Sequence, residues 1–128
     1  MKLLLDTCSF LWAVRGDALL SAEASALFRD PANEVFLSAV SAWEIAVKYS
    51  LGKLPLSDVP ARYVPRERER HGIEPLPLGE ADTLLLDRLP AVHTDPFDRL
   101  LVCQAVQHGM TLLTPDPMIH RYPVPVRW

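Results

Sequence analysis

The chain has 128 residues, of which 49% are hydrophobic and 23% charged, and its formal net charge is −3 at pH 7. This size and composition predict one compact domain over residues 1–128 with a sizeable core. The small negative charge argues against a protein that binds nucleic acid through a broad basic surface, although a local site could still bind phosphate with the help of a divalent cation.

The cysteines and the apolar runs exclude further classes. Cys8 and Cys103 lack the neighbours of a disulfide framework or a zinc site, so we expect both to be small core residues. No apolar run is long enough to span a membrane, and Asp6 interrupts the first one before a signal-peptide core could form. We therefore expect a cytoplasmic protein that does not associate with membranes.

The first 52 residues alternate between strand and helix patterns. A short apolar run that ends at Asp6 is typical of a buried strand, and Ser21 has the pattern of a helix cap. Gly52 follows a segment that has Trp43, Val47 and Leu51 on one helical face. The predicted elements are a strand over 1–5, helices over 10–14 and 21–29, a strand over 34–39 and a helix over 41–51.

The second half is less regular at first. Prolines at 55, 60 and 65 interrupt the pattern, and the mixed charges of residues 66–70 indicate a solvated helix face. A proline-containing strand over 73–78 suits a sheet edge. Helices over 80–89 and 96–108, a strand over 110–114, a turn at 115–117 and a strand over 124–126 complete the chain. The alternation predicts an α/β domain with a mostly parallel sheet between helices, in three α/β/α layers.

Acidic residues occur at or near the predicted strand-to-helix junctions. Each has a local explanation in helix capping: Ser41 and Glu44 fit a capping box, Asp95 precedes Pro96 and Asp98, and Asp116 precedes Pro117. Asp6 could simply begin a turn. The residues concerned are Asp6, Glu44, Asp95, Asp98 and Asp116.

A parallel sheet would bring these acids to one edge, where ligands of α/β domains bind. Converging carboxylates repel one another, and Mg²⁺ or Mn²⁺ removes that penalty. The chain shows no Ser–His pair, no reactive-cysteine setting and no glycine-rich phosphate loop. Carboxylates with divalent cations suit the hydrolysis of a phosphodiester.

The arrangement resembles the PIN domain, a metal-dependent nuclease fold, and in particular the VapC-type toxins of bacterial toxin–antitoxin pairs. The similarity runs from end to end of the chain, and the HTDPFDR stretch at 93–99 is the part most specific to one branch of the family. The other matching stretches are LLLDT at 3–7, FLW at 10–12, SAVSAWEIAVK at 38–48, LPL at 76–78, LLTPD at 112–116 and the tail from Tyr122 to Trp128.

The resemblance implies an endoribonuclease that uses Mg²⁺ or Mn²⁺, is inhibited by a small antitoxin and forms a homodimer. It implies Asp6, Glu44, Asp98 and Asp116 as catalytic residues and metal ligands, with Asp95 as an additional candidate ligand. At Thr114-Pro115-Asp116 many relatives have an arginine between the threonine and the aspartate. We therefore expect any phosphate contact of that arginine to be absent here.

Several residues near the acids have two interpretations each. Thr7 and Thr114 could orient carboxylates or belong to plain turns, and Lys48 could approach phosphate or form a surface pair with Glu44. Arg99 could contact RNA or face water, and His93 is a possible though less expected metal ligand. The expected role of Trp12 and Trp43 is to anchor the core or a partner interface.

Three rival functions are weighed against the nuclease. A phosphoacceptor receiver domain needs paired acids after the first strand and a lysine at a late strand end, and neither is present. An aspartate-nucleophile phosphatase needs Asp-x-Asp, which Cys8 breaks. A PIN scaffold that only binds RNA or a protein partner remains the alternative. In such a nuclease, unpaired bases of the target RNA would be recognised by loop shape and a few contacts.

Overall fold

The computed structural model describes residues 1–128 and contains one five-stranded sheet in which every pairing is parallel. The strand order is β3-β2-β1-β4-β5, so that the first strand occupies the centre. In the register of the sheet, Leu4 of β1 lies between Phe36 of β2 and Leu112 of β4. The strands are β1 (Lys2–Leu5), β2 (Glu34–Ser38), β3 (Glu74–Leu76), β4 (Thr111–Leu113) and β5 (Val126–Arg127).

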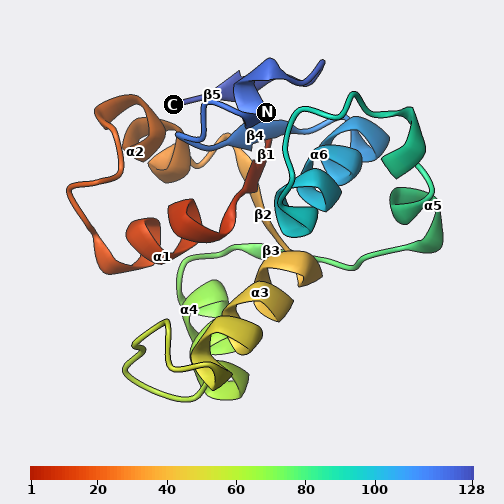
Figure 1. The fold of residues 1–128 in the computed structure, drawn as a ribbon. Coiled ribbons are helices and arrows are strands. Elements are labelled where there is room, and N and C mark those ends of the chain that lie inside the picture. Colours follow the sequence, from red (N-terminus) through yellow and green to blue (C-terminus); the bar gives the residue numbers. More distant parts are fainter.

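Helices cover both faces of this sheet, as the sequence predicted (Figure 1). None of them is long and apolar enough to cross a membrane. The α-helices are α1 (Thr7–Arg15), α2 (Ala22–Arg29), α3 (Ala39–Ser50), α4 (Pro60–Arg70), α5 (Glu80–Thr83) and α6 (Pro96–His108), and two 3₁₀ turns are η1 (Leu86–Arg88) and η2 (Ile119–Arg121).

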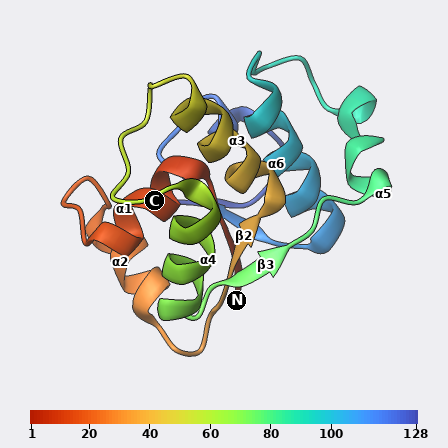
Figure 2. The ribbon, with the colours of Figure 1, turned by 90° about the horizontal axis from the view of Figure 1, so that it is seen from below.

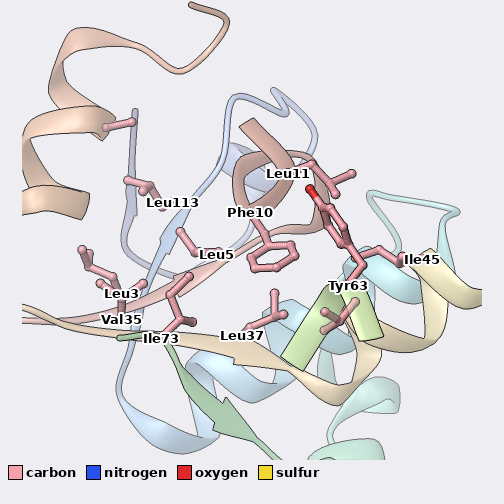
Figure 3. Packing of buried hydrophobic residues seen from close by; sticks show 12 residues of the cluster. Leu3, Leu5, Phe10, Leu11, Val35, Leu37, Ile45, Tyr63, Ile73 and Leu113 are labelled. Atoms are coloured by element: carbon pink, nitrogen blue, oxygen red, sulfur yellow. The ribbon is translucent and has the colours of Figure 1, made fainter. Parts of the chain in front are cut away.

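Alternate residues of β1 enter two separate hydrophobic clusters. Leu3 and Leu5 pack on one face with Phe10 of α1 and Tyr63 of α4 (Figure 3). On the other face, Leu4 packs in a cluster that includes Leu101, Val102 and Ala105 of α6 and Tyr122. Successive strand side chains point to opposite faces, so an unbroken Leu-Leu-Leu run is what a strand buried on both sides requires. This division confirms the three-layer α/β/α architecture.

The carboxyl edge of the sheet is where three helices begin. Asp6 lies directly between β1 and α1, and Ser38 is both the last residue of β2 and the N-cap of α3. Helix α6 starts with Pro96 behind its cap Asp95. Figure 2, which views the molecule from below Figure 1, shows α3 and α6 next to each other. Side chains from the first turns of these helices therefore converge.

Some predicted boundaries were wrong, for identifiable reasons. The predicted capping box is absent, because α3 begins at Ala39 with Ser38 as its cap, whose hydroxyl accepts from the Val40 N–H. The Ser41 hydroxyl is buried without a partner. The predicted apolar face is wrong at two of its three residues: Trp43 is 53% and Leu51 62% exposed and only Val47 is partly buried, whereas Ile45 is fully buried.

Other elements differ in length. Helix α1 starts at Thr7 rather than at residue 10 because Asp6 caps it, and the helix expected over 80–89 divides into α5 and η1. Helix α4 continues through Pro65, which the sequence had suggested would interrupt it. The last strand is Val126–Arg127, two residues beyond its expected start. Strand β3 lies at a sheet edge, as predicted.

Candidate active site

Asp6 is held rigidly at the end of the central strand. Its Oδ1 accepts a hydrogen bond from the Ser9 N–H at 2.9 Å, and its Oδ2 accepts one from the Thr114 hydroxyl at 2.5 Å. The residue is only 4% exposed, and burial raises the pKa of its carboxyl despite these hydrogen bonds. Asp6 thus caps α1 and also presents a poorly solvated carboxylate at the sheet edge.

Glu44 reaches the same edge from the first turns of α3. Its Oε1 accepts from the Thr7 hydroxyl at 2.6 Å, and its Oε2 accepts from the Lys48 ammonium. The predicted surface pair of Lys48 with Glu44 is therefore present, and this hydrogen bond is the main reason why the pKa of Lys48 is raised. Glu44 is 5% exposed, so its role is not that of a surface cap.

Helix α6 contributes two acids from its first turn. Asp95 is the N-cap and accepts from the Phe97 N–H at 2.8 Å and the Asp98 N–H at 3.5 Å, so the capping interpretation is correct for this residue. Asp98 lines the same cleft as the other carboxylates, and its side chain is 17% exposed. Burial and the nearby charges of Asp95, Asp6 and Glu44 raise the pKa of Asp98 to about 7.

Asp116 follows β4 and forms a turn with the backbone of its own loop. Its Oδ1 accepts from the Met118 N–H at 2.8 Å, and its backbone N–H donates to the Thr114 hydroxyl at 3.1 Å. Its Oδ2 lies 2.9 Å from His93 Nε2, which is also 3.2 Å from Asp98 Oδ2. His93 therefore connects two of the predicted site residues.

The acids share one cleft of about 460 Å³. Cationic side chains of Arg15, Lys48 and Lys53 line it too, together with the indole of Trp12. Trp12, which the sequence predicts to anchor the core or a partner interface, has a half-buried ring that forms part of the cleft wall. All five predicted residues line this cleft: Asp6, Glu44, Asp95, Asp98 and Asp116.

Oxygen-rich donors of this kind fit a hard divalent cation. Burial, followed by the charges of Asp95, Asp6 and Glu44, raises the pKa of Asp98, and a bound cation would favour its ionised form. Carboxylates are the ligands that Mg²⁺ and Mn²⁺ prefer. Cys8 adds no soft ligand or nucleophile, because burial and the Asp6 charge raise the pKa of its thiol.

The surroundings of two residues near the site differ from those that the sequence predicts. Arg99 is half-buried and does not line the cleft, and its guanidinium donates to the Leu86 carbonyl at 3.1 Å and thereby joins α6 to η1. His93 is not among the five acids that the sequence predicts for the site, yet its ring contacts two of them. The HTDPFDR stretch, which contains His93, was the only sequence feature that could have indicated this role. Its partner Asp116 is 23 residues away, and only the fold brings the two side chains together.

Comparison with known protein families matches residues 3–125 to the PIN domain. The chain belongs to the PIN domain family. Ribonuclease VapC16 of Mycobacterium tuberculosis (strain ATCC 25618 / H37Rv) is 48% identical over 61 residues, which are 48% of this chain and 43% of that protein. The match thus spans less than half of the length of this curated relative.

Solved structures with the same PIN fold cover nearly the whole chain. VapBC2 from Rickettsia felis, bound to a DNA fragment from its promoter, superposes with a TM-score of 0.73 at 17% identity and covers 100% of this chain and 99% of the other. FitAcB from Neisseria gonorrhoeae gives a TM-score of 0.61 at 20% identity, with coverage of 97% and 95%. At these identities the likeness concerns the fold.

Proposed function

We propose that this PIN domain is a Mg²⁺- or Mn²⁺-dependent endoribonuclease that acts as the toxin of a toxin–antitoxin pair. The observation that carries the proposal is the convergence of five carboxylates in one cleft, with the pKa of Asp98 raised to about 7. Likeness to Ribonuclease VapC16 supports RNA as the substrate. Hydrolysis of a phosphodiester is the reaction that this donor set suits.

In this proposal Asp6, Glu44 and Asp98 hold the cation, and Asp116 completes the site. Asp95 caps α6 and adds negative charge to the cleft. If a second cation binds, Asp95 would be one of its ligands. Thr7 and Thr114 donate hydrogen bonds that fix the orientation of the Glu44 and Asp6 carboxylates. When bound, the cation supplies positive charge that stabilises the reacting phosphate and makes water more acidic.

Cationic residues that line the cleft are suited to bind the RNA backbone. Arg15 and Lys53 are exposed and line the same cleft as the acids, so they are suited to contact phosphates on either side of the cleaved bond. Trp12 offers an aromatic face on which an unpaired base can stack. Only a few phosphates would be contacted, which agrees with the net charge of −3.

We also propose protein partners. A small antitoxin that covers the cleft is supported by the likeness to VapBC2 and FitAcB. A homodimer remains a prediction that the resemblance to VapC-type toxins implies. An exposed apolar surface is available to them, since Trp43 is 53% exposed and packs edge-on against Phe97 with ring centroids 4.8 Å apart. Such a toxin would meet its RNA and its antitoxin in the cytoplasm. Light scattering of the purified protein measures the homodimer directly.

The decisive experiment uses purified, antitoxin-free protein and a mixed pool of structured RNAs. Cleavage is measured with Mg²⁺, with Mn²⁺ and with EDTA, and cut ends are mapped by sequencing. Asp6→Asn and Asp98→Asn are expected to abolish cleavage. Asparagine at residue 6 can still accept from the Ser9 N–H, so the cap of α1 is retained. Asp87→Asn, at an exposed position in η1, is the matched control and should cut like the parent protein.

The same experiment tests the alternative of a PIN scaffold that only binds RNA or a protein. That alternative requires no cleavage in any metal and no Mn²⁺ binding in calorimetry. Cutting that persists in EDTA, or in both Asn variants, would contradict the metal-dependent site.

A further inference from the structure

The imidazole of His93 contacts two carboxylates, Asp98 in the first turn of α6 and Asp116 in the loop after β4. Its Nε2 is 2.9 Å from Asp116 Oδ2 and 3.2 Å from Asp98 Oδ2. The His93 side chain is 16% exposed, which is less than the 27% of Asp116. A single nitrogen therefore contacts one acid on a helix and one on a loop.

The orientation of the ring is set by groups other than these two acids. The His93 N–H donates to the hydroxyl of the buried Tyr122 at 2.8 Å, which anchors the backbone of the loop. The ring nitrogen Nδ1 accepts from the Asp95 N–H at 3.1 Å. Because Nδ1 uses its lone pair as an acceptor, the ring proton is on Nε2, which therefore acts as a donor.

This arrangement decides between two roles for His93. The ligand atoms of His93, Asp98 and Asp116 lie within 4.8 Å of one another, a geometry that would also suit a metal site with one nitrogen and two oxygen ligands. However, an Nε2 that carries a proton has no lone pair for a metal. To coordinate through Nε2, the ring would have to place its proton on Nδ1, opposite the Asp95 N–H.

We propose that His93 is a positioning residue, which holds Asp116 beside Asp98 by donating from Nε2 to Asp116 Oδ2 while the same nitrogen lies 3.2 Å from Asp98 Oδ2, and that it does not itself coordinate the cation. The proposal rests on the proposed metal-dependent function. Two like charges on separate elements repel each other, and the shared donor offsets that repulsion before a cation arrives. Apart from His93, the Asp116 carboxylate is held by the N–H of Met118 in its own loop.

The ring proton is tested first, in metal-free protein with ¹⁵N-labelled histidine. The His93 signals are assigned by their loss in His93→Gln. The expected NMR result is a protonated Nε2 and an unprotonated Nδ1. A proton on Nδ1, either alone or in addition to one on Nε2, would overturn the proposed donor role.

The effect on the cation is tested by Mn²⁺ titration with electron paramagnetic resonance. His93→Ala is expected to weaken Mn²⁺ binding about tenfold or more, the usual effect of losing a residue that orients a metal ligand. His93→Gln should recover part of this loss, since its side-chain amide can also donate. His71 ends α4 and does not line the cleft, so His71→Gln is the histidine control and should bind Mn²⁺ like the parent protein.

Two further measurements separate positioning from coordination and from general damage to the fold. Electron spin echo of the Mn²⁺-loaded parent protein should show no coupling to a histidine nitrogen, and coupling that disappears in His93→Gln would overturn the proposal. RNA cleavage by His93→Ala should be restored by excess Mn²⁺. If His93→Ala binds Mn²⁺ and cuts RNA like the parent protein, only the role of His93 is overturned. A parent protein that binds no Mn²⁺ would overturn the proposed function as well.

Discussion

At the scale of single residues, one hydroxyl connects two of the acids. Thr114 donates to Asp6 Oδ2 at 2.5 Å and accepts from the Asp116 N–H at 3.1 Å, and the residue is fully buried. It thus joins the end of the central strand to the loop after β4. The sequence placed Thr114 next to Asp116, but its side chain orients the more distant Asp6.

We expect Thr114→Val to lower RNA cleavage at limiting Mn²⁺ by about tenfold, because the Asp6 carboxylate loses its orienting donor. Thr114→Ser keeps the hydroxyl and should stay within about twofold of the parent protein. Rates measured over a Mn²⁺ series check this. Equal rates for the Val and Ser variants would show that the hydrogen bond has no part in activity.

A second prediction at this scale concerns Asp98, whose pKa is about 7 in the folded metal-free protein and normally near 3.8. The folded state therefore retains a proton that the unfolded chain has lost between about pH 4 and 7. The Asp98 carboxyl lowers the free energy of unfolding as the pH rises through this window, by at most about 4 kcal/mol.

In EDTA, Asp98→Asn should consequently unfold at a higher temperature than the parent protein at pH 8, and the difference should nearly vanish at pH 4. Adding Mn²⁺ at pH 8 should stabilise the parent protein much more than the variant. Thermal unfolding followed by circular dichroism measures both effects. A difference between the two proteins that does not change with pH would contradict the assigned pKa shift.

At the scale of elements, a buried polar network fixes α6 against α3 and α5. The Gln104 side chain is fully buried, accepts from the Ser38 hydroxyl, and donates to the Pro77 carbonyl and to Asp82 Oδ2. Asp82 in turn accepts from the Gly79 N–H and contacts His108. Since Ser38 caps the helix that carries Glu44, this network sets the relative placement of two helices that supply acids.

We predict that Gln104→Ala lowers the free energy of unfolding by about 3 kcal/mol, because it leaves a cavity and buried polar atoms without partners. Gln107→Ala, at an exposed position of the same helix, should change it by less than about 0.5 kcal/mol. Urea unfolding monitored by circular dichroism gives both values. Similar values for the two variants would mean that the network does not stabilise the packing of α6.

At the scale of the whole molecule, charge is distributed so that the cleft contains both signs. The chain has a net charge of −3, yet Arg15, Lys48 and Lys53 all line the cleft that holds the acids. Lys48 is paired with Glu44, which leaves two cations without an acidic partner in the cleft. RNA binding should therefore involve few phosphates.

The salt dependence of RNA binding measures this number. For a single-stranded RNA and the inactive Asp98→Asn variant, the slope of log K against log [NaCl] should be only about −1.4, since each of the two neutralised phosphates contributes about −0.7. Arg15→Ala should make the slope shallower by about 0.7, whereas Arg29→Ala, on α2 outside the cleft, should not change it. Fluorescence anisotropy is the measurement, and a slope as steep as −5 would indicate a broad basic surface instead.

The sequence predicted the elements best where local chemistry is decisive. The Leu-Leu-Leu run before Asp6 predicted a doubly buried strand, and Asp95-Pro96 predicted the start of α6. The sequence-based prediction was wrong where two nearby residues could both serve as the cap of one helix. Ser38 and Ser41 are both good caps for α3, and the choice between them depends on how β2 enters the sheet.

The sequence by itself therefore determined the α/β alternation, the family and the five candidate acids, because helix caps, strand patterns and the HTDPFDR stretch are local features. Only the tertiary structure decided which atoms meet. Contacts such as Thr114 with Asp6 and His93 with Asp116 join residues that are 108 and 23 positions apart. Parallel strand pairing creates the first contact, since it brings the carboxyl ends of β1 and β4 to one edge of the sheet. The second depends on the loop before α6, which the Tyr122 hydroxyl holds at His93.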